Sequence, residues 1–308
     1  MKCCEVFRPG TPYESFPWRP YAYWHAPIGL WNVVTLPLRV FLTMGTFLSV
    51  SVVARVYCIL RKRTRRFDRA FDFFAMWSSR LTLRIFGFRV EVIDESSKDD
   101  DDDDDGPTVV VANHVAVYDG FAVMAATGAV SFVARSSFFK VPVVGSILRA
   151  LEVVGVDRRR GEEARKAIHV ALRNPAKRWP LAAFPEGATT NGQGLIIFKT
   201  GVFEGVDRVK PVFLRYGCRS NFDLSYTANQ MDSKAVLCHF LRTLMEPGKV
   251  IEIKLLPVMA RLPDESDRHF ADRVRRTIAG NNSILWDTWD NARLRQAWFD
   301  EQKASAID

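Results

Sequence analysis

The chain has 308 residues and a net charge of +8, with 48% hydrophobic and 25% charged residues, enough for one large domain with or without an appendage. Seven aspartates at 99–105 contribute −7, so the rest of the chain carries +15, and we expect anionic partners such as membrane headgroups or nucleic acid. The five cysteines show neither metal-ligand spacing nor an even framework, which argues against a disulfide scaffold and favours reduced thiols facing the cytosol.

The first 27 residues are rich in proline and aromatic residues. They lack the basic start and apolar core of a signal peptide, so we predict an irregular lead-in over 1–27.

Residues 28–88 are predicted to be a membrane-associated helical segment. Residues 38–60 are apolar and would form a helix of about 34 Å, long enough to span or re-enter a bilayer. Only 15 uncharged residues separate Arg39 from Arg55, whose side chains are expected to reach toward opposite membrane faces. The basic run RKRTRR at 61–66 predicts that this end of the helix faces the cytosol. A nucleic-acid patch is the competing interpretation, but no base-reading module accompanies it.

The following stretch, 67–88, is predicted to be an amphipathic helix lying on the headgroups. Its apolar residues recur at spacings of three and four, namely Phe67, Ala70, Phe71, Phe74, Trp77 and Leu81.

From residue 89 to 308 the pattern is that of an α/β domain. Short apolar or alternating runs predict strands at 88–94, 108–112, 130–134, 153–156, 181–184, 209–214 and 250–256. Helix-length segments separate them, most clearly 161–174, so we predict a twisted, mainly parallel sheet flanked by helices. The acidic stretch 96–106 resembles a calcium loop only at its start, and we predict a solvated hairpin insert.

The stretch VVVANHVAVYDG places His114 at the end of a predicted strand and Asp119 in the first turn of a predicted helix. Local hydrogen bonding and helix capping explain such a pair without chemistry. Alternatively, a carboxylate that holds one imidazole nitrogen leaves the other as a general base. The sequence contains no GxSxG nucleophile, HExxH metal set or phosphate loop, so the base would act on a substrate hydroxyl.

Two further blocks suggest ligand contacts. Phe184-Pro185-Glu186-Gly187 ends a predicted strand and opens a glycine-rich turn that a ligand can approach closely. The run Arg158–Arg160 lies between a strand and a helix N-terminus, a place that suits a phosphate. An ordinary turn and an exposed basic turn are the plain alternatives.

Together these blocks resemble the glycerolipid O-acyltransferase (PlsC-like) family. His114 and Asp119 match its HxxxxD motif, Gly155 to Arg158 its GxxFxxR-like block, residues 184–187 its FPEG block, and Pro211 its late proline. The stretches TNGQGLIIFKTGVF and SNFDLSYT resemble the lysophosphatidylcholine and lysophosphatidylethanolamine acyltransferase branch. Ala116 and Ala188 depart from the usual Ser and Thr, which bears on substrate fit more than on activity.

The resemblance implies a membrane-bound enzyme that transfers a fatty acyl group from acyl-CoA, as co-substrate, to a lysophospholipid, with no other cofactor, metal or nucleic acid. His114 would be the base and Asp119 its orienting partner. The predicted substrate-binding residues are Asn113, Arg158, Phe184, Pro185, Glu186, Gly187, Lys199 and Pro211. We expect the endoplasmic reticulum membrane, with the catalytic domain facing the cytosol. The alternatives are 1-acylglycerol-3-phosphate or glycerol-3-phosphate acyl transfer, CoA-independent transacylation, and a catalytically silent membrane-binding protein.

Overall fold

The structure is a computed structural model that describes residues 30–61, 66–96, 109–157, 161–174, 177–190, 192–217, 233–246, 248–280, 284–294 and 296–297. The predicted lead-in 1–27, the acidic run of the insert 96–106, Arg158–Arg160 and the stretch SNFDLSYT lie outside the described residues.

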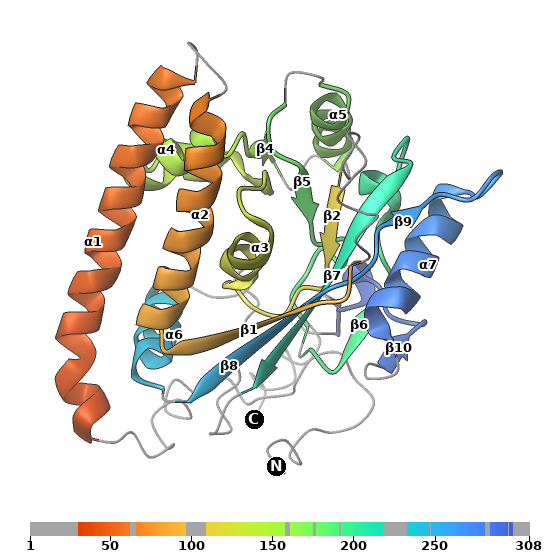
Figure 1. Cartoon of the computed structure of the whole chain (residues 1–308). Helices are drawn as coiled ribbons and strands as arrows, with labels where there is room; N and C mark the ends of the chain where they lie inside the picture. The colour runs from red at the N-terminus through yellow and green to blue at the C-terminus, as the bar shows by residue number, and fades with distance from the viewer. Residues whose placement is uncertain are drawn as a thin grey trace.

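A central sheet organises the described part of the chain and has the strand order β1-β8-β7-β2-β5, with β9 paired to β7 (Figure 1). The β1–β8, β7–β2 and β2–β5 pairs are parallel, whereas β8 and β9 run antiparallel to β7. Two short parallel pairs, β3–β4 and β6–β10, lie outside it. The strands are β1 (Phe88–Asp94), β2 (Val109–Ala112), β3 (Val133–Arg135), β4 (Val154–Val156), β5 (Leu181–Ala183), β6 (Gly194–Ile196), β7 (Arg208–Gly217), β8 (Lys249–Leu255), β9 (Met259–Ala260) and β10 (Ile284–Trp286). The mainly parallel, helix-flanked sheet that the sequence predicts is therefore confirmed.

Helices cover both faces of this sheet. They are α1 (Leu30–Leu60), α2 (Arg66–Ile85), α3 (Asp119–Thr127), α4 (Pro142–Ala150), α5 (Gly161–Leu172), α6 (Ser233–Met245) and α7 (Asp267–Ala279), with 3₁₀ turns η3 (Ser136–Lys140) and η4 (Thr200–Val202). Because side chains alternate along a strand, Val110 of β2 faces the core beneath α2 and α3, while Val111 faces the core beneath α7. The C-terminal end of β2, where His114 follows, thus lies between two packed layers.

The predicted hairpin around the acidic insert is wrong. β1 is an edge strand that pairs with β8, and two strands, β8 and β7, separate it from β2. β1 and β2 follow one another along the chain but are therefore not neighbours in the sheet. The cause is the late strand β8, which takes the place beside β1 that a hairpin would give to β2.

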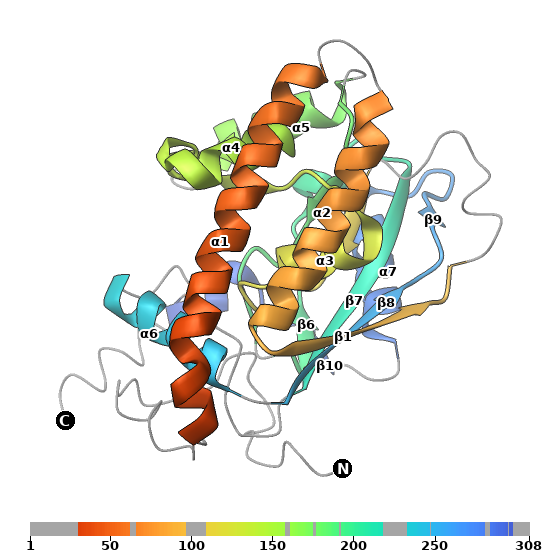
Figure 2. The ribbon, with the colours of Figure 1, turned by 60° about the vertical axis from the view of Figure 1, so that its left-hand side comes forward.

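Helix α1 is the long apolar helix that the sequence predicts near the N-terminus. The 28 residues Val33–Leu60 have a mean hydropathy of 1.7. By length and composition, this part of the helix is long and apolar enough to cross a membrane. Its outward face carries exposed apolar side chains, including Phe41 at 73% exposure and Met44 at 68%. Figures 1 and 2 show the helix lying alongside α2 at one flank of the molecule.

Arg39 and Arg55 contact helices of the α/β domain, and their predicted reach toward opposite membrane faces stays a prediction. The Arg39 guanidinium donates to the carbonyl of Leu244 at the end of α6. The Arg55 guanidinium donates to Ser146 Oγ, at 2.8 Å, and to the carbonyl of Pro142, both in α4. Both arginines therefore point toward the α/β domain, because its carbonyl and hydroxyl groups satisfy guanidinium donors that lipid cannot.

Helix α2 belongs to the same core as the sheet. Its buried side chains Phe71, Ala75 and Leu83 pack in one cluster with Val110 of β2 and Ala122 of α3. Tyr57 of α1 stacks on Phe71 at a centroid distance of 4.1 Å, which links the two helices. The amphipathic character predicted for 67–88 is present, with the buried face directed at the domain.

Candidate active site

His114 and Asp119 lie in contact at the C-terminal end of β2. The strand ends at Ala112, and α3 begins at Asp119, so six residues form the connecting loop. His114 Nδ1 is 2.7 Å from Asp119 Oδ2. The histidine side chain is 23% exposed and the aspartate is fully buried. A buried carboxylate that accepts from Nδ1 leaves Nε2 with a lone pair, the arrangement of a general base.

Four donors hold the Asp119 carboxylate. Besides the imidazole, Oδ2 accepts from the backbone amides of Val115 at 2.7 Å and Ala116 at 3.0 Å. Oδ1 accepts from the Tyr216 hydroxyl at 2.6 Å. The carboxylate is therefore fixed from both sides. Tyr216 was missed by the sequence reasoning, because only the pairing of β7 with β2 brings residue 216 next to residue 119.

Glu186 supports the backbone of the same loop. Its Oε1 accepts from the His114 amide at 2.7 Å, and its Oε2 accepts from the Ile196 amide at 3.3 Å. The side chain is fully buried. In this structure it fixes the loop that carries the base, and its predicted contact with substrate stays a prediction.

Burial raises the pKa of Glu186 from 4.5 to about 8, although the amides of His114 and Ile196 oppose the rise. The nearby Asp119 charge raises this pKa further, and Arg275 lowers it. Near neutral pH the carboxyl is thus largely protonated, which avoids a second buried negative charge beside that of Asp119.

Aromatic rings pack beside the imidazole. The Phe184 ring stacks on His114 at a centroid distance of 4.6 Å and an interplanar angle of 20°. Phe132 stacks in turn on Phe184 at 6.2 Å. The Phe184 ring thus limits the orientations open to His114. No sequence pattern pointed to Phe132, because its contact with Phe184 depends on the fold.

Asn113 and Pro211 have structural places in this region. The Asn113 side chain donates to the Leu214 carbonyl and accepts from the Leu214 amide, so it ties the end of β2 to β7. Pro211 is buried in β7 and falls between the residues paired with β9 and those paired with β8. Its missing N–H therefore interrupts the hydrogen bonds of neither the β7–β8 pair nor the β7–β9 pair. Substrate contacts for both residues stay predictions.

Lys199 lies over the turn after Phe184. Gly187 has a φ of +71°, and a Cβ there would lie 2.6 Å from Lys199 Nζ, so only glycine fits without moving the lysine. The Lys199 amide donates to the Pro185 carbonyl at 2.9 Å. The structure therefore brings Lys199 to the FPEG turn, on the side of the fold that carries His114. Arg158 lies outside the described residues.

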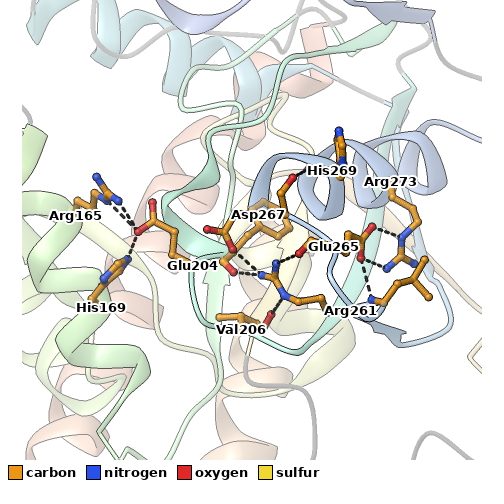
Figure 3. Close-up of polar contacts among 12 residues, drawn as sticks. Arg165, His169, Glu204, Val206, Arg261, Glu265, Asp267, His269 and Arg273 are labelled. Carbon is orange, nitrogen blue, oxygen red and sulfur yellow. Dashed lines mark hydrogen bonds and ion pairs between the residues drawn. The ribbon is translucent and has the colours of Figure 1, made fainter.

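Ion pairs fix the turn that follows Lys199, as Figure 3 shows. Glu204 Oε2 lies 2.8 Å from Arg165 Nη2 and 2.7 Å from His169 Nε2, both on α5. From the other side, Arg261 donates to the Val206 carbonyl and pairs with Asp267 of α7 at 2.9 Å. The segment after Lys199 is thus held between two helices.

The two departures from the family pattern are compatible with this geometry. Ala116 is fully buried and contributes its amide to Asp119, so no hydroxyl is needed at that position. Ala188 is buried behind the FPEG turn. Among the described residues no group of three or more His, Cys, Asp or Glu side chains could hold a metal ion.

Comparison with known proteins identifies an acyltransferase domain in the chain. Residues 89–214 match the family model described as Acyltransferase. Lysophosphatidylcholine acyltransferase 2 of Rattus norvegicus is 34% identical over 200 residues, which cover 63% of this chain and 35% of that protein. The lipid droplet-regulating VLDL assembly factor AUP1 homolog of Caenorhabditis elegans is 30% identical over 264 residues, which cover 84% of this chain and 58% of that protein.

The matched part of the chain thus covers about a third to just over half of the length of these relatives. Among solved structures, the 1-acyl-sn-glycerophosphate acyltransferase PlsC of Thermotoga maritima has the same fold, with a TM-score of 0.56 at 18% identity. The match covers 81% of this chain and 93% of that one. On the evidence of the matched domain, the relatives and the shared fold, the chain belongs to the glycerolipid O-acyltransferase family.

Proposed function

We propose that the protein transfers a fatty acyl group from acyl-CoA to the free hydroxyl of a lysophospholipid at a membrane surface. The observation that carries the proposal is the 2.7 Å contact between a partly exposed His114 and a fully buried Asp119. This geometry provides a general base whose tautomer is fixed by Asp119.

The reaction follows from the site residues. His114 Nε2 removes the proton from the acceptor hydroxyl as its oxygen attacks the thioester carbonyl. The tetrahedral intermediate collapses with cleavage of the carbon–sulfur bond, and the imidazolium returns the proton to the leaving CoA thiolate. The products are the acylated phospholipid and free CoA, without an acyl-enzyme.

The acceptor phosphate needs a cation near His114. Lys199 is exposed and its amine lies over Gly187, which suits a single-charged phosphodiester approaching the FPEG turn. Arg158 would add a second cation, by family resemblance. A zwitterionic lysophospholipid is therefore our preferred acceptor, supported by similarity to lysophosphatidylcholine acyltransferase 2.

Membrane attachment through α1 suits an acceptor that water does not dissolve. The exposed apolar face of α1 offers the attachment surface. We place the protein on the endoplasmic reticulum membrane with its catalytic domain in the cytosol, where acyl-CoA is available.

One alternative has a specific observation behind it. The match to the AUP1 homolog covers 84% of this chain, whereas the match to lysophosphatidylcholine acyltransferase 2 covers 63%. The name of the AUP1 homolog describes lipid-droplet regulation. A membrane protein that keeps the fold without turnover is therefore the second candidate.

An acceptor panel separates these possibilities. Detergent-solubilised protein is incubated with labelled oleoyl-CoA and lysophosphatidylcholine, lysophosphatidylethanolamine, lysophosphatidic acid or glycerol 3-phosphate, and CoA release is measured. We expect the first two to react fastest and His114→Ala to lower the rate by about 10²- to 10⁴-fold. Fastest use of lysophosphatidic acid or glycerol 3-phosphate would refute the acceptor assignment. An equally active His114→Ala protein would refute the base, and absence of CoA release with every acceptor would favour the second candidate or transacylation.

A further inference from the structure

The two oxygens of the Asp119 carboxylate have different partners. Oδ2 accepts from His114 and from two backbone amides. Oδ1 accepts from the Tyr216 hydroxyl at 2.6 Å, and this is its hydrogen bond among the described residues. Tyr216 thus contacts the base only through Asp119.

The register of the sheet delivers the Tyr216 hydroxyl to this place. Leu214, two residues earlier on β7, is bound through its amide and carbonyl by the Asn113 side chain at the end of β2. The Tyr216 ring packs edge-on against Phe88 at a centroid distance of 6.0 Å. Position 216 is therefore fixed both along the strand and across the core.

The hydroxyl acts as a permanent donor. Burial and the neighbouring Asp119 charge raise the pKa of Tyr216 well above its usual value, so the phenol keeps its proton throughout the neutral range. A donor that keeps its proton at neutral pH stabilises the charged form of the carboxylate it faces.

We propose that Tyr216 is a positioning residue that fixes the Asp119 carboxylate and moderates its attraction for the proton on His114. The inference rests on the proposed acyl transfer for its role in turnover. Without the phenol, Oδ1 of a fully buried carboxylate loses its donor, so the carboxylate becomes more basic and attracts the imidazolium more strongly. The base would then be protonated at higher pH and less firmly oriented.

The substitution Tyr216→Phe does not alter the other ionisable residues around the base. Glu186 faces the His114 amide, Lys199 lies over Gly187, and Tyr118 precedes Asp119 at the start of α3. A change in the titration of His114 in Tyr216→Phe therefore reports the lost hydrogen bond.

The first measurement is the pH profile of acyl transfer. In Tyr216→Phe we expect kcat to fall roughly 10-fold, KM for the lysophospholipid to change less than about 2-fold, and the acid limb of kcat/KM to move upward by about one pH unit. Asp119→Asn should move that limb downward, because the charge that stabilises the imidazolium is gone. Tyr118→Phe is the matched control, since it removes the hydroxyl of a neighbouring tyrosine that is only 1% exposed, and should leave the limb in place.

The second measurement does not need turnover. Histidine labelled with ¹³C at the ring is titrated by NMR, and the His114 signal is identified by its loss in His114→Ala. A midpoint raised in Tyr216→Phe supports the positioning role even if no acceptor in the panel reacts, so failure of the proposed function and failure of this inference remain distinguishable. Superimposable titrations of wild type and Tyr216→Phe, with only a lower melting temperature in the variant, would show a purely structural role and overturn the proposal.

Discussion

At the scale of single residues, two buried carboxylates bind three successive backbone amides. The amide of His114 donates to Glu186, and those of Val115 and Ala116 donate to Asp119. These amides are therefore committed to the fold and do not face substrate. The oxyanion of the proposed reaction must use other donors, and Lys199, an exposed residue whose amine lies beside Gly187, is a candidate on this side of the site.

Glu186 makes the stability of the protein depend on pH. Its pKa is about 8 in the folded protein against 4.5 unperturbed, so the folded state keeps a proton that the unfolded state loses. The contribution of Glu186 thus lowers stability as pH rises from about 4.5 to about 8, by at most about 1.4 kcal/mol per pH unit, and is constant above that range.

We expect Glu186→Gln to abolish this part of the pH dependence, because the amide does not titrate. The measurement is the melting temperature from pH 5 to 9. The melting temperature of the variant relative to that of wild type should therefore rise with pH and level off near pH 8. Glu95→Gln, which changes an exposed carboxyl, is the control. A gap that stays constant across the range would contradict the raised pKa.

The sequence was sufficient to find residues whose roles are local. His114 and Asp119 are five positions apart, and a strand followed by a helix brings them together. Tyr216 and Phe132 could not be found in this way, because their contacts depend on which strands become neighbours. For the same reason, the sequence did not show that both oxygens of Glu186 bind backbone amides.

At the scale of elements, α1 combines an apolar outer face with a polar attachment to the domain. Phe41 and Leu48 are exposed, whereas Arg39 and Arg55 bind α6 and α4. Contacts of α1 with α4 and with α6 hold it along the domain, as Figure 2 also shows. The apolar face of α1 is therefore available for the bilayer attachment that we propose, with the domain alongside.

We expect Phe41→Asp combined with Leu48→Asp to release the protein from membranes. Each change is worth roughly 3 kcal/mol on an insertion scale, and neither side chain is buried in the fold. The assay is the fraction that sediments with membranes after carbonate extraction, which should remain high for wild type. The control pair is Val170→Asp with Leu262→Asp, two exposed apolar positions on the domain. Equal sedimentation of the α1 variant and wild type, or release of wild type by carbonate, would contradict the assignment of α1 as the anchor.

Element boundaries were largely predictable and element neighbours were not. The strand predicted at 88–94 and the helix predicted at 161–174 correspond to β1 and α5 within two residues, because alternation and helical spacing are local signals. Strand β6 escaped prediction, since it is three residues long and lies in a glycine-rich stretch. The place of β8 between β1 and β7 depends on long-range pairing that no local pattern records.

At the scale of the whole molecule, the α1–α2 pair and the α/β domain share one core. The buried side chains of Phe71, Leu83 and Phe86 on or just after α2 pack in the same cluster as Val110 and Ala122. Polar contacts add to this: Arg178 donates from its amide to Glu152 and from its guanidinium to the carbonyl of Arg61. The sequence pattern changes near residue 88, but the hydrophobic core continues across it.

A chain that comprises only residues 89–308 should therefore fail to fold cooperatively. Removing α2 uncovers the partners of Phe71, Leu83 and Phe86, and at about 2 to 3 kcal/mol for each large side chain the loss is comparable to the whole stability of a domain. A chain that comprises residues 66–308 keeps α2 and serves as the matched comparison, because it lacks the apolar face of α1 but retains this part of the core. Thermal unfolding followed by circular dichroism should show a cooperative transition for 66–308 and a broad, gradual change for 89–308. A sharp transition and acyl transfer by 89–308 would show instead that the α/β domain is an independent folding unit and that α2 serves only to attach it to the membrane.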